Sequence, residues 1–92
     1  RGEEADLSLR QMTILLTIYL EPPPHTVRAL AAKLNVSKPV ITRALDAMGK
    51  LALVSRKRDD KDLRNVLIQR TVEGSLFLES LADEISATTK GL

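Results

Sequence analysis

One amphipathic stretch, residues 37–51 (SKPVITRALDAMGKL), constrains the fold of this 92-residue chain more than any other. Ser37 is a predicted helix N-cap, because its hydroxyl can accept a backbone N–H of the first turn. Pro39 stands just inside that start, where a missing N–H costs little. Apolar side chains then recur at helical spacing, at Val40, Ile41, Ala44, Leu45, Met48 and Leu51. One face of this helix therefore belongs to a core, and the other faces solvent.

A second predicted helix, over 26–34, ends just before this start. Thr26 is its predicted N-cap, and its inward face is formed by Val27, Leu30, Ala31 and Leu34. Asn35 suits the left-handed position at its end. Only Asn35 and Val36 then separate the two helices. So tight a joint predicts a helix-turn-helix, in which the helix over 37–51 is the recognition helix.

The solvent face of the recognition helix is short, polar and mostly basic, which suits insertion into a DNA major groove. It carries Pro39, Thr42, Arg43, Asp46 and Lys50, with Ser37 and Lys38 at the end that enters the groove. Arg43 and Lys38 are expected to contact either bases or phosphates. Two interpretations of Asp46 stay open: it pairs with Lys50 four residues later, or it accepts a hydrogen bond from a cytosine amino group.

The first predicted helix, over 8–20, has apolar side chains on both sides. Ser8 and Gln11 match a capping box at its start, and three prolines over 22–24 end it. One face holds Leu9, Met12, Leu15, Leu16, Tyr19 and Leu20, and the other holds Leu7, Ile14 and Ile18. A helix that is apolar on two sides lies between two layers. His25 follows the prolines and is interpreted as a solvated loop residue.

The segment over 53–70 predicts a charged β-hairpin. Strands over 53–57 and 65–70 flank a turn rich in charge, and such a hairpin directly after a recognition helix forms a wing. In the turn, at least one of Asp59, Asp60 and Asp62 is expected to hold a basic side chain in place.

A last predicted helix, over 71–88, is capped by Thr71. Its apolar face carries Phe77, Leu78, Leu81 and Ile85, together with Gly74, where a small residue allows close approach. The predicted fold is a single domain over 1–92, mainly α with a small β-hairpin. It is a winged helix-turn-helix in the order α-α-α-β-β-α.

Basic side chains concentrate in the middle of the chain. Residues 26–70 hold eleven Lys or Arg against four Asp or Glu, whereas residues 1–25 and 71–92 carry net charges of −2 and −3. This distribution indicates a centre that binds a polyanion, between flanks that stay away from it.

Several classes of function lack their signatures. With no cysteine and one histidine, the chain has no thiol chemistry and no Cys-type or multi-histidine metal site. The scattered glycines form no phosphate-binding loop, and the acidic turn lacks the glycine and glutamate of a calcium loop. We therefore expect no enzyme, cofactor or metal. No apolar run is long enough to span a membrane, and a cytoplasmic protein is expected.

Both ends of the chain are expected to be loose, over residues 1–7 and in the final TTKGL. The chain begins at Arg1 rather than Met, so residues are expected to be missing there.

Residues 30–74, LAAKLNVSKPVITRALDAMGKLALVSRKRDDKDLRNVLIQRTVEG, resemble the winged-helix domain of the MarR family of bacterial transcriptional regulators. The resemblance covers the turn, the recognition helix, the wing and the Thr-x-x-Gly start of the next helix. It implies a DNA-binding regulator that dimerises through long terminal helices. Family members are typically longer than this chain, so it is expected to be trimmed or to have a compact dimer interface.

Two departures from the family pattern matter. Ala52 stands where the family usually has glycine before the wing, and alanine tolerates a left-handed helix end poorly. The recognition helix is therefore expected to end at Gly49 or to continue differently. Leu63 stands where the wing motif Asp-Arg-Arg has its first arginine. A wing contact with DNA must then rest on Arg58, Lys61 or Arg64, or be weaker.

These interpretations give two sets of candidate residues. The predicted DNA-binding set is Ser37, Lys38, Pro39, Thr42, Arg43, Lys50, Arg58, Lys61 and Arg64. The predicted dimer set is Leu7, Ile14, Ile18, Phe77, Leu78, Leu81 and Ile85, whose side chains either cover each other within one chain or, as we expect, meet across a two-fold axis.

The expected partners are double-stranded DNA, bound as a palindrome, and a second copy of the chain. The sequence does not identify a small-molecule effector, and whether one binds stays open. The alternative function is a winged helix that serves as a protein–protein interaction module without DNA specificity.

Overall fold

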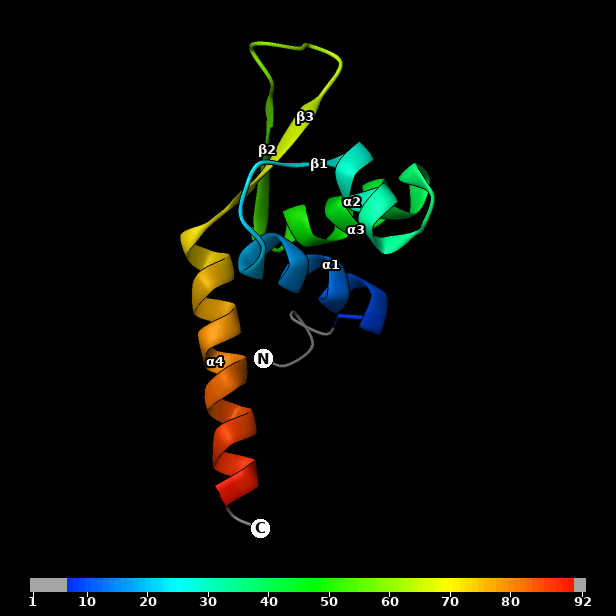
Figure 1. Ribbon diagram of the computed structural model, residues 1–92. Helices are drawn as coiled ribbons and strands as arrows, with labels where there is room; N and C mark the ends of the chain where they lie inside the picture. The colour runs from blue at the N-terminus through cyan, green and yellow to red at the C-terminus, as the bar shows by residue number, and fades with distance from the viewer. Residues whose placement is uncertain (1–6, 91–92) are drawn as a thin grey trace.

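The computed structural model describes residues 7–90, with the backbone alone at 88–90. Within them, four helices and three strands form the predicted winged helix-turn-helix (Figure 1): α1 (Leu9–Leu20), β1 (His25–Thr26), α2 (Val27–Leu34), α3 (Lys38–Lys50), β2 (Val54–Arg58), β3 (Val66–Arg70) and α4 (Val72–Lys90). Of the ends expected to be loose, 1–6 and 91–92 lie outside the described residues. Leu7 packs against the core, and the backbone of α4 continues to Lys90.

Each helix begins at the cap that the sequence predicts. The Ser8 N–H donates to Gln11 Oε1 at 2.9 Å and the Gln11 N–H donates to Ser8 Oγ at 3.0 Å, which closes the capping box. Thr26, Ser37 and Thr71 each accept a hydrogen bond from the backbone N–H three residues on, at 3.0, 3.4 and 2.8 Å. Local chemistry therefore determines where these helices start.

The helices α2 and α3 end in the same way. In both, a backbone N–H donates at 3.0 Å to the carbonyl five residues earlier, the long bond of a Schellman motif. The residue inside each motif is left-handed: Asn35 has a φ of 57° and Ala52 a φ of 60°. The expectation for Asn35 is confirmed. Ala52 adopts the conformation that glycine usually supplies, and α3 consequently runs to Lys50 rather than ending at Gly49.

The small sheet is antiparallel, with β3 in the centre and β1 and β2 at its edges. The strand β1 is one element that the sequence did not predict, because two residues are too short to produce a periodic pattern. Its pairing of His25 with Ile68 places the imidazole inside the protein, where it is 6% exposed. The interpretation of His25 as a solvated loop residue is therefore wrong. Its Nε2 lies 3.1 Å from the Glu21 carbonyl oxygen.

One core joins α1, the helix-turn-helix and the base of the wing. Its buried apolar side chains are Ile14, Leu15, Ile18, Leu30, Ala31, Ile41, Ala44, Leu45, Met48, Leu53, Val54 and Ile68. The assignment of Ile14 and Ile18 to an outer, dimer-forming face is wrong, because both are 0% exposed within the single chain. The helix α1 packs against α3 and β3, so it turns these two residues inward. Leu9 and Leu20 face solvent instead.

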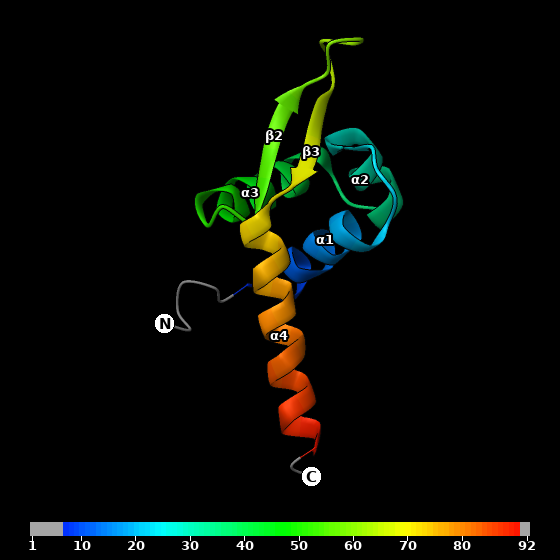
Figure 2. The same ribbon diagram turned by 90° about the vertical axis from the view of Figure 1, so that its left-hand side faces the viewer.

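Within the part of the chain that the structure describes, α4 packs against the core near its start. Gly74 is buried there, and an added Cβ would overlap the Tyr19 hydroxyl and the Leu53 carbonyl oxygen, so the predicted close approach is confirmed. Phe77 and Leu78 pack against the core. Beyond them α4 runs away from the body, toward the end of the molecule opposite the wing (Figures 1 and 2).

Candidate nucleic-acid interface

The recognition helix α3 is held in one rotational setting by its buried face. Ile41, Ala44, Leu45 and Met48 are all buried in the core, which turns the opposite face to solvent. As a result, every residue of the predicted DNA-binding set on α3 and its cap is exposed: Ser37, Lys38, Pro39, Thr42, Arg43 and Lys50. The three wing residues of the set, Arg58, Lys61 and Arg64, are exposed as well.

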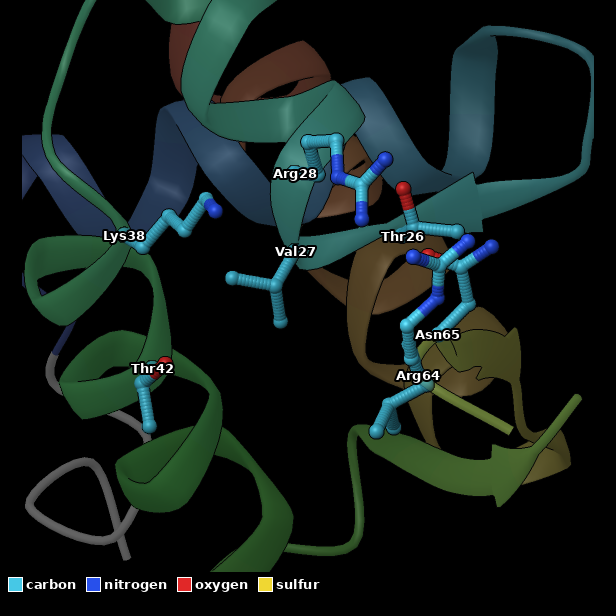
Figure 3. Close-up of a pocket in the computed structure, with 8 residues that line it drawn as sticks. Thr26, Val27, Arg28, Lys38, Thr42, Arg64 and Asn65 are labelled. Atoms are coloured by element: carbon cyan, nitrogen blue, oxygen red, sulfur yellow. The ribbon is translucent and has the colours of Figure 1, made fainter. Parts of the chain in front are cut away.

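A hollow of about 230 Å³ separates the start of α3 from the wing. Figure 3 shows Lys38 and Thr42 on α3, Arg28 on α2 and Arg64 of the wing around this space. Three cationic side chains from three segments therefore border one concave surface. Lys38 takes part in no ion pair or side-chain hydrogen bond within the described residues, so its ammonium is available to an anion.

The turn of the wing is ordered by its own acidic residues. Asp62 accepts two side-chain hydrogen bonds from Arg64, at 3.1 and 3.2 Å, and a third from the Arg64 N–H at 3.1 Å. The Arg64 guanidinium therefore holds the pKa of Asp62 below its ordinary value, so the carboxylate is charged at neutral pH. Arg58 donates to the Leu63 carbonyl at 3.1 Å, across the turn. The expectation that an aspartate holds a basic side chain in place is confirmed for Asp62.

Asp46 connects the recognition helix to the wing. Its Oδ1 lies 2.9 Å from Nη1 of Arg56 on β2. Of the two interpretations of Asp46, the pairing with Lys50 is therefore wrong. The two side chains are 55% and 38% exposed, and an exposed pair of this kind stabilises a fold by less than about 1 kcal/mol. Its larger effect is on charge, because Arg56 neutralises the one carboxylate on the exposed strip of α3.

Comparison with known proteins agrees with this geometry. Residues 7–66 match the sequence profile of the MarR family. The chain belongs to the MarR family. It is 31% identical over 90 residues to the organic hydroperoxide resistance transcriptional regulator of Bacillus subtilis, a match that covers 98% of this chain and 60% of the relative. This MarR-family chain thus spans about three fifths of that relative's length.

Solved structures of similar fold include DNA-bound structures of two proteins, MepR and AbfR. A MepR variant of S. aureus bound to an oligodeoxyribonucleotide is 25% identical, with a TM-score of 0.79, over 97% of this chain and 67% of that one. Overoxidized AbfR bound to DNA is 26% identical, with a TM-score of 0.80, over 94% of this chain and 62% of that one. A transcriptional regulator of Thermotoga maritima, at 21% identity, matches in fold with a TM-score of 0.83 over 98% of this chain and 63% of that one.

The structure of this MarR-family chain brings to the interface two basic residues, Arg28 and Arg56, that were not in the predicted DNA-binding set. Arg28 lies in the first turn of α2, and it lines the hollow together with Lys38 and Thr42 of α3. Arg56 alternates with Ser55 and Lys57 on β2, but a strand pattern does not show which residue meets α3. Arg56 therefore required the three-dimensional structure.

The described part of this MarR-family chain contains no group of three or more His, Asp or Glu side chains that could hold a metal ion. No helix within it is long and apolar enough to cross a membrane.

Proposed function

We propose that this MarR-family chain is a transcriptional regulator that binds double-stranded DNA sequence-specifically, with α3 in the major groove and the wing on the adjacent minor groove or backbone. The observation that carries the proposal is the convergence of Arg28, Lys38 and Arg64 around one hollow beside the exposed strip of α3. Two relatives of this fold are bound to DNA. A regulator of this kind acts in the cytoplasm.

The exposed residues divide into two roles under this proposal. Arg43, in the middle of the exposed strip of α3, contacts a base edge, where a bidentate arginine contributes about 1–3 kcal/mol of discrimination. Lys38, Arg28 and Arg64 contact phosphates, which fix the position of the protein and carry no sequence information. Ser37, Pro39, Thr42, Lys50, Arg58 and Lys61 complete the contact surface.

Salt dependence tests the proposal. Binding to a fluorescent duplex, measured by anisotropy at about 50 and about 200 mM salt, is expected to weaken steeply, because each neutralised phosphate releases condensed counterions. Lys38→Ala is expected to lower the slope of log affinity against log salt by about 1. Lys33→Ala is the matched control, because Lys33 lies on α2 in an ion pair with Glu21 at 3.3 Å, away from the hollow.

Two results would contradict the proposal. One is a wild-type chain that binds no duplex at the lower salt concentration. The other is an equal effect of Lys38→Ala and Lys33→Ala on the slope, which would assign binding to overall charge. Either result favours the alternative, a protein–protein interaction module.

We also propose that the functional unit is a homodimer bound to a palindromic site. Past the contacts of Phe77 and Leu78 with the core, the same face of α4 continues with Leu81, which is half-buried, and Ile85, which is 58% exposed. A two-fold pair would bury this stripe and place two recognition helices about 34 Å apart, one turn of DNA. Leu7, Phe77 and Leu78 pack on the core of their own chain.

The oligomeric state tests the dimer. A double variant, Leu81→Glu with Ile85→Glu, is expected to sediment as a monomer and to keep its helical circular dichroism, because like charges would meet in the interface. Ala87→Glu, on another face of the same part of α4, is the control and is expected to remain dimeric. A wild-type chain that sediments as a monomer at high concentration would contradict the dimer.

A further inference from the structure

The direction of α4 is determined close to its start. Among the described residues, Gly74, Phe77 and Leu78 in its first turns pack against the body, and the helix then projects away in both views (Figures 1 and 2). A helix of 19 residues is about 28 Å long, so a tilt of about 10° at its start moves its far end by roughly 5 Å. Small changes at the start are therefore amplified along α4.

Tyr19 of α1 connects three segments at this point. Its hydroxyl donates to the Leu53 carbonyl at 2.7 Å, just after the end of α3, and accepts from the Thr71 N–H at 2.9 Å, just before α4. Thr71 Oγ1 in turn donates to the Ala52 carbonyl at 2.7 Å and caps α4 through the Gly74 N–H at 2.8 Å. The absence of a side chain at Gly74 lets the first turn of α4 contact the Tyr19 hydroxyl.

Arg70, the last residue of β3, connects the segment just before α4 to the end of α1. Its Nε donates to the Ile18 carbonyl at 2.9 Å and its Nη2 to the Glu21 carbonyl at 2.8 Å, at the C-terminal end of α1. The Ile18 carbonyl belongs to the last turn of α1, where the negative end of the helix dipole strengthens a bond from a cation. The guanidinium also lies 5.9 Å from the centre of the Tyr19 ring.

We propose that Tyr19 and Arg70 form a joint that fixes the direction of α4 and, through it, the spacing of the two recognition helices on DNA. The first half concerns the single chain, and the second half rests on the proposed DNA-binding dimer. Tyr19 and Arg70 are positioning residues, because their side chains bond to the backbone of the protein itself. Since adjacent base pairs are about 3.4 Å apart, a movement of roughly 5 Å at the end of α4 is enough to misplace a half-site contact.

Spin-label distances test the joint within one chain. The sequence has no native cysteine, so Ala32→Cys on α2 and Ser86→Cys on α4 introduce the only two labels, both at exposed positions. Dilution with unlabelled chain leaves the distance within one chain as the signal. The doubly labelled chain with native Tyr19 is expected to give one narrow distribution of label-to-label distances. Tyr19→Phe removes only the hydroxyl and is expected to give a broader or displaced distribution. Thr17→Val is the control, because the Thr17 hydroxyl bonds to the Thr13 carbonyl inside α1.

A second variant and a DNA measurement complete the test. Arg70→Gln removes the guanidinium from an exposed position and is expected to broaden the same distribution, so the joint remains testable if Tyr19→Phe fails to fold. The DNA measurement compares the affinity for the duplex that the wild-type chain selects from a random pool with the affinity for the same duplex carrying one extra base pair between the half-sites. In both variants, the ratio of these two affinities is expected to fall by about tenfold or more.

The label distances also separate the two proposals. Distributions as narrow as in the control, for whichever variants fold, would overturn the joint whether or not DNA binds. Broadened distributions with an unchanged spacing preference would overturn its connection to DNA spacing. A wild-type chain that binds no DNA would refute the proposed function and leave the label distances to decide whether the joint exists.

Discussion

Ala52 is the residue whose backbone conformation fits its side chain least well. Its φ of 60° places the Cβ close to a carbonyl oxygen, at a cost of about 1 kcal/mol relative to glycine. We therefore expect Ala52→Gly to stabilise the protein by about 1 kcal/mol in urea denaturation. Asn35→Gly is the control: Asn35 has nearly the same φ, but asparagine tolerates this conformation, so its gain is expected to be smaller. An Ala52→Gly variant no more stable than the wild type would contradict the account of this helix end.

Leu63 is an apolar residue at the exposed turn of the wing, where it is 62% exposed. Under the proposed function this turn approaches phosphate, so Leu63→Arg is expected to tighten duplex binding at low salt and to steepen its salt dependence by about one phosphate contact. The control is Leu63→Gln, which adds polarity without charge. Equal affinities of the two variants at low salt would show that the wing does not approach DNA.

Single residues were predictable from sequence where their chemistry is local. Ser37 and Thr71 cap helices through bonds to backbone three residues away, and Asn35 suits its left-handed position by itself. The pairing of Asp46 with Arg56 was not predictable, because it joins two elements whose mutual orientation depends on the packed core. Helical spacing suggested Lys50 instead, the nearest basic residue along the same helix.

Among the elements, the contact of α4 with α1 depends on Gly74. Glycine inside a helix usually costs about 1 kcal/mol relative to alanine, so an ordinary Gly→Ala change there stabilises. At position 74 the added Cβ would overlap the Tyr19 hydroxyl, and we expect Gly74→Ala to destabilise the protein by about 1–3 kcal/mol. The free energy of unfolding is measured by urea denaturation, monitored through the fluorescence of Tyr19. Because Tyr19 is the only tyrosine in the sequence, the signal comes from the contact itself.

Ser75→Ala is the control for this prediction, because Ser75 is exposed in the same turn of α4. If Gly74→Ala proved more stable than the wild type, the first turn of α4 would not lie against Tyr19 as described.

The order and type of the helices and the wing were predictable, since periodicity, caps and the proline run act within each element. The set of α1 residues that face the core was not predictable, because the helix is apolar on both sides. Both sides contribute to the core, since Ile14 and Ile18 from one and Leu15 from the other are buried where α1 packs against α3 and β3. Leu9 faces solvent. The strand β1 and the buried His25 likewise arise from pairing with β3, which lies more than forty residues later in the chain.

The whole molecule is elongated, about 49 Å in its longest dimension, with the wing and the C-terminal end of α4 at opposite ends (Figure 1). Apart from Arg10 on α1, the exposed basic residues among those the structure describes lie on α2, α3 and the wing, whereas α4 exposes Glu73, Glu79, Asp83 and Glu84. This separation of charge favours one orientation toward a polyanion, with α4 pointing away from it. The acidic C-terminal flank predicted from sequence thus has a physical role in the proposed complex.

Selection from a randomised duplex pool tests the central claim, sequence-specific DNA binding through α3, most directly. The wild-type chain is expected to enrich a two-fold symmetric motif. Arg43→Ala is expected to enrich a motif that has lost its preference at one base pair in each half, since one base contact contributes about 1–3 kcal/mol of discrimination. No enrichment by the wild-type chain, or the same motif from both proteins, would contradict the account.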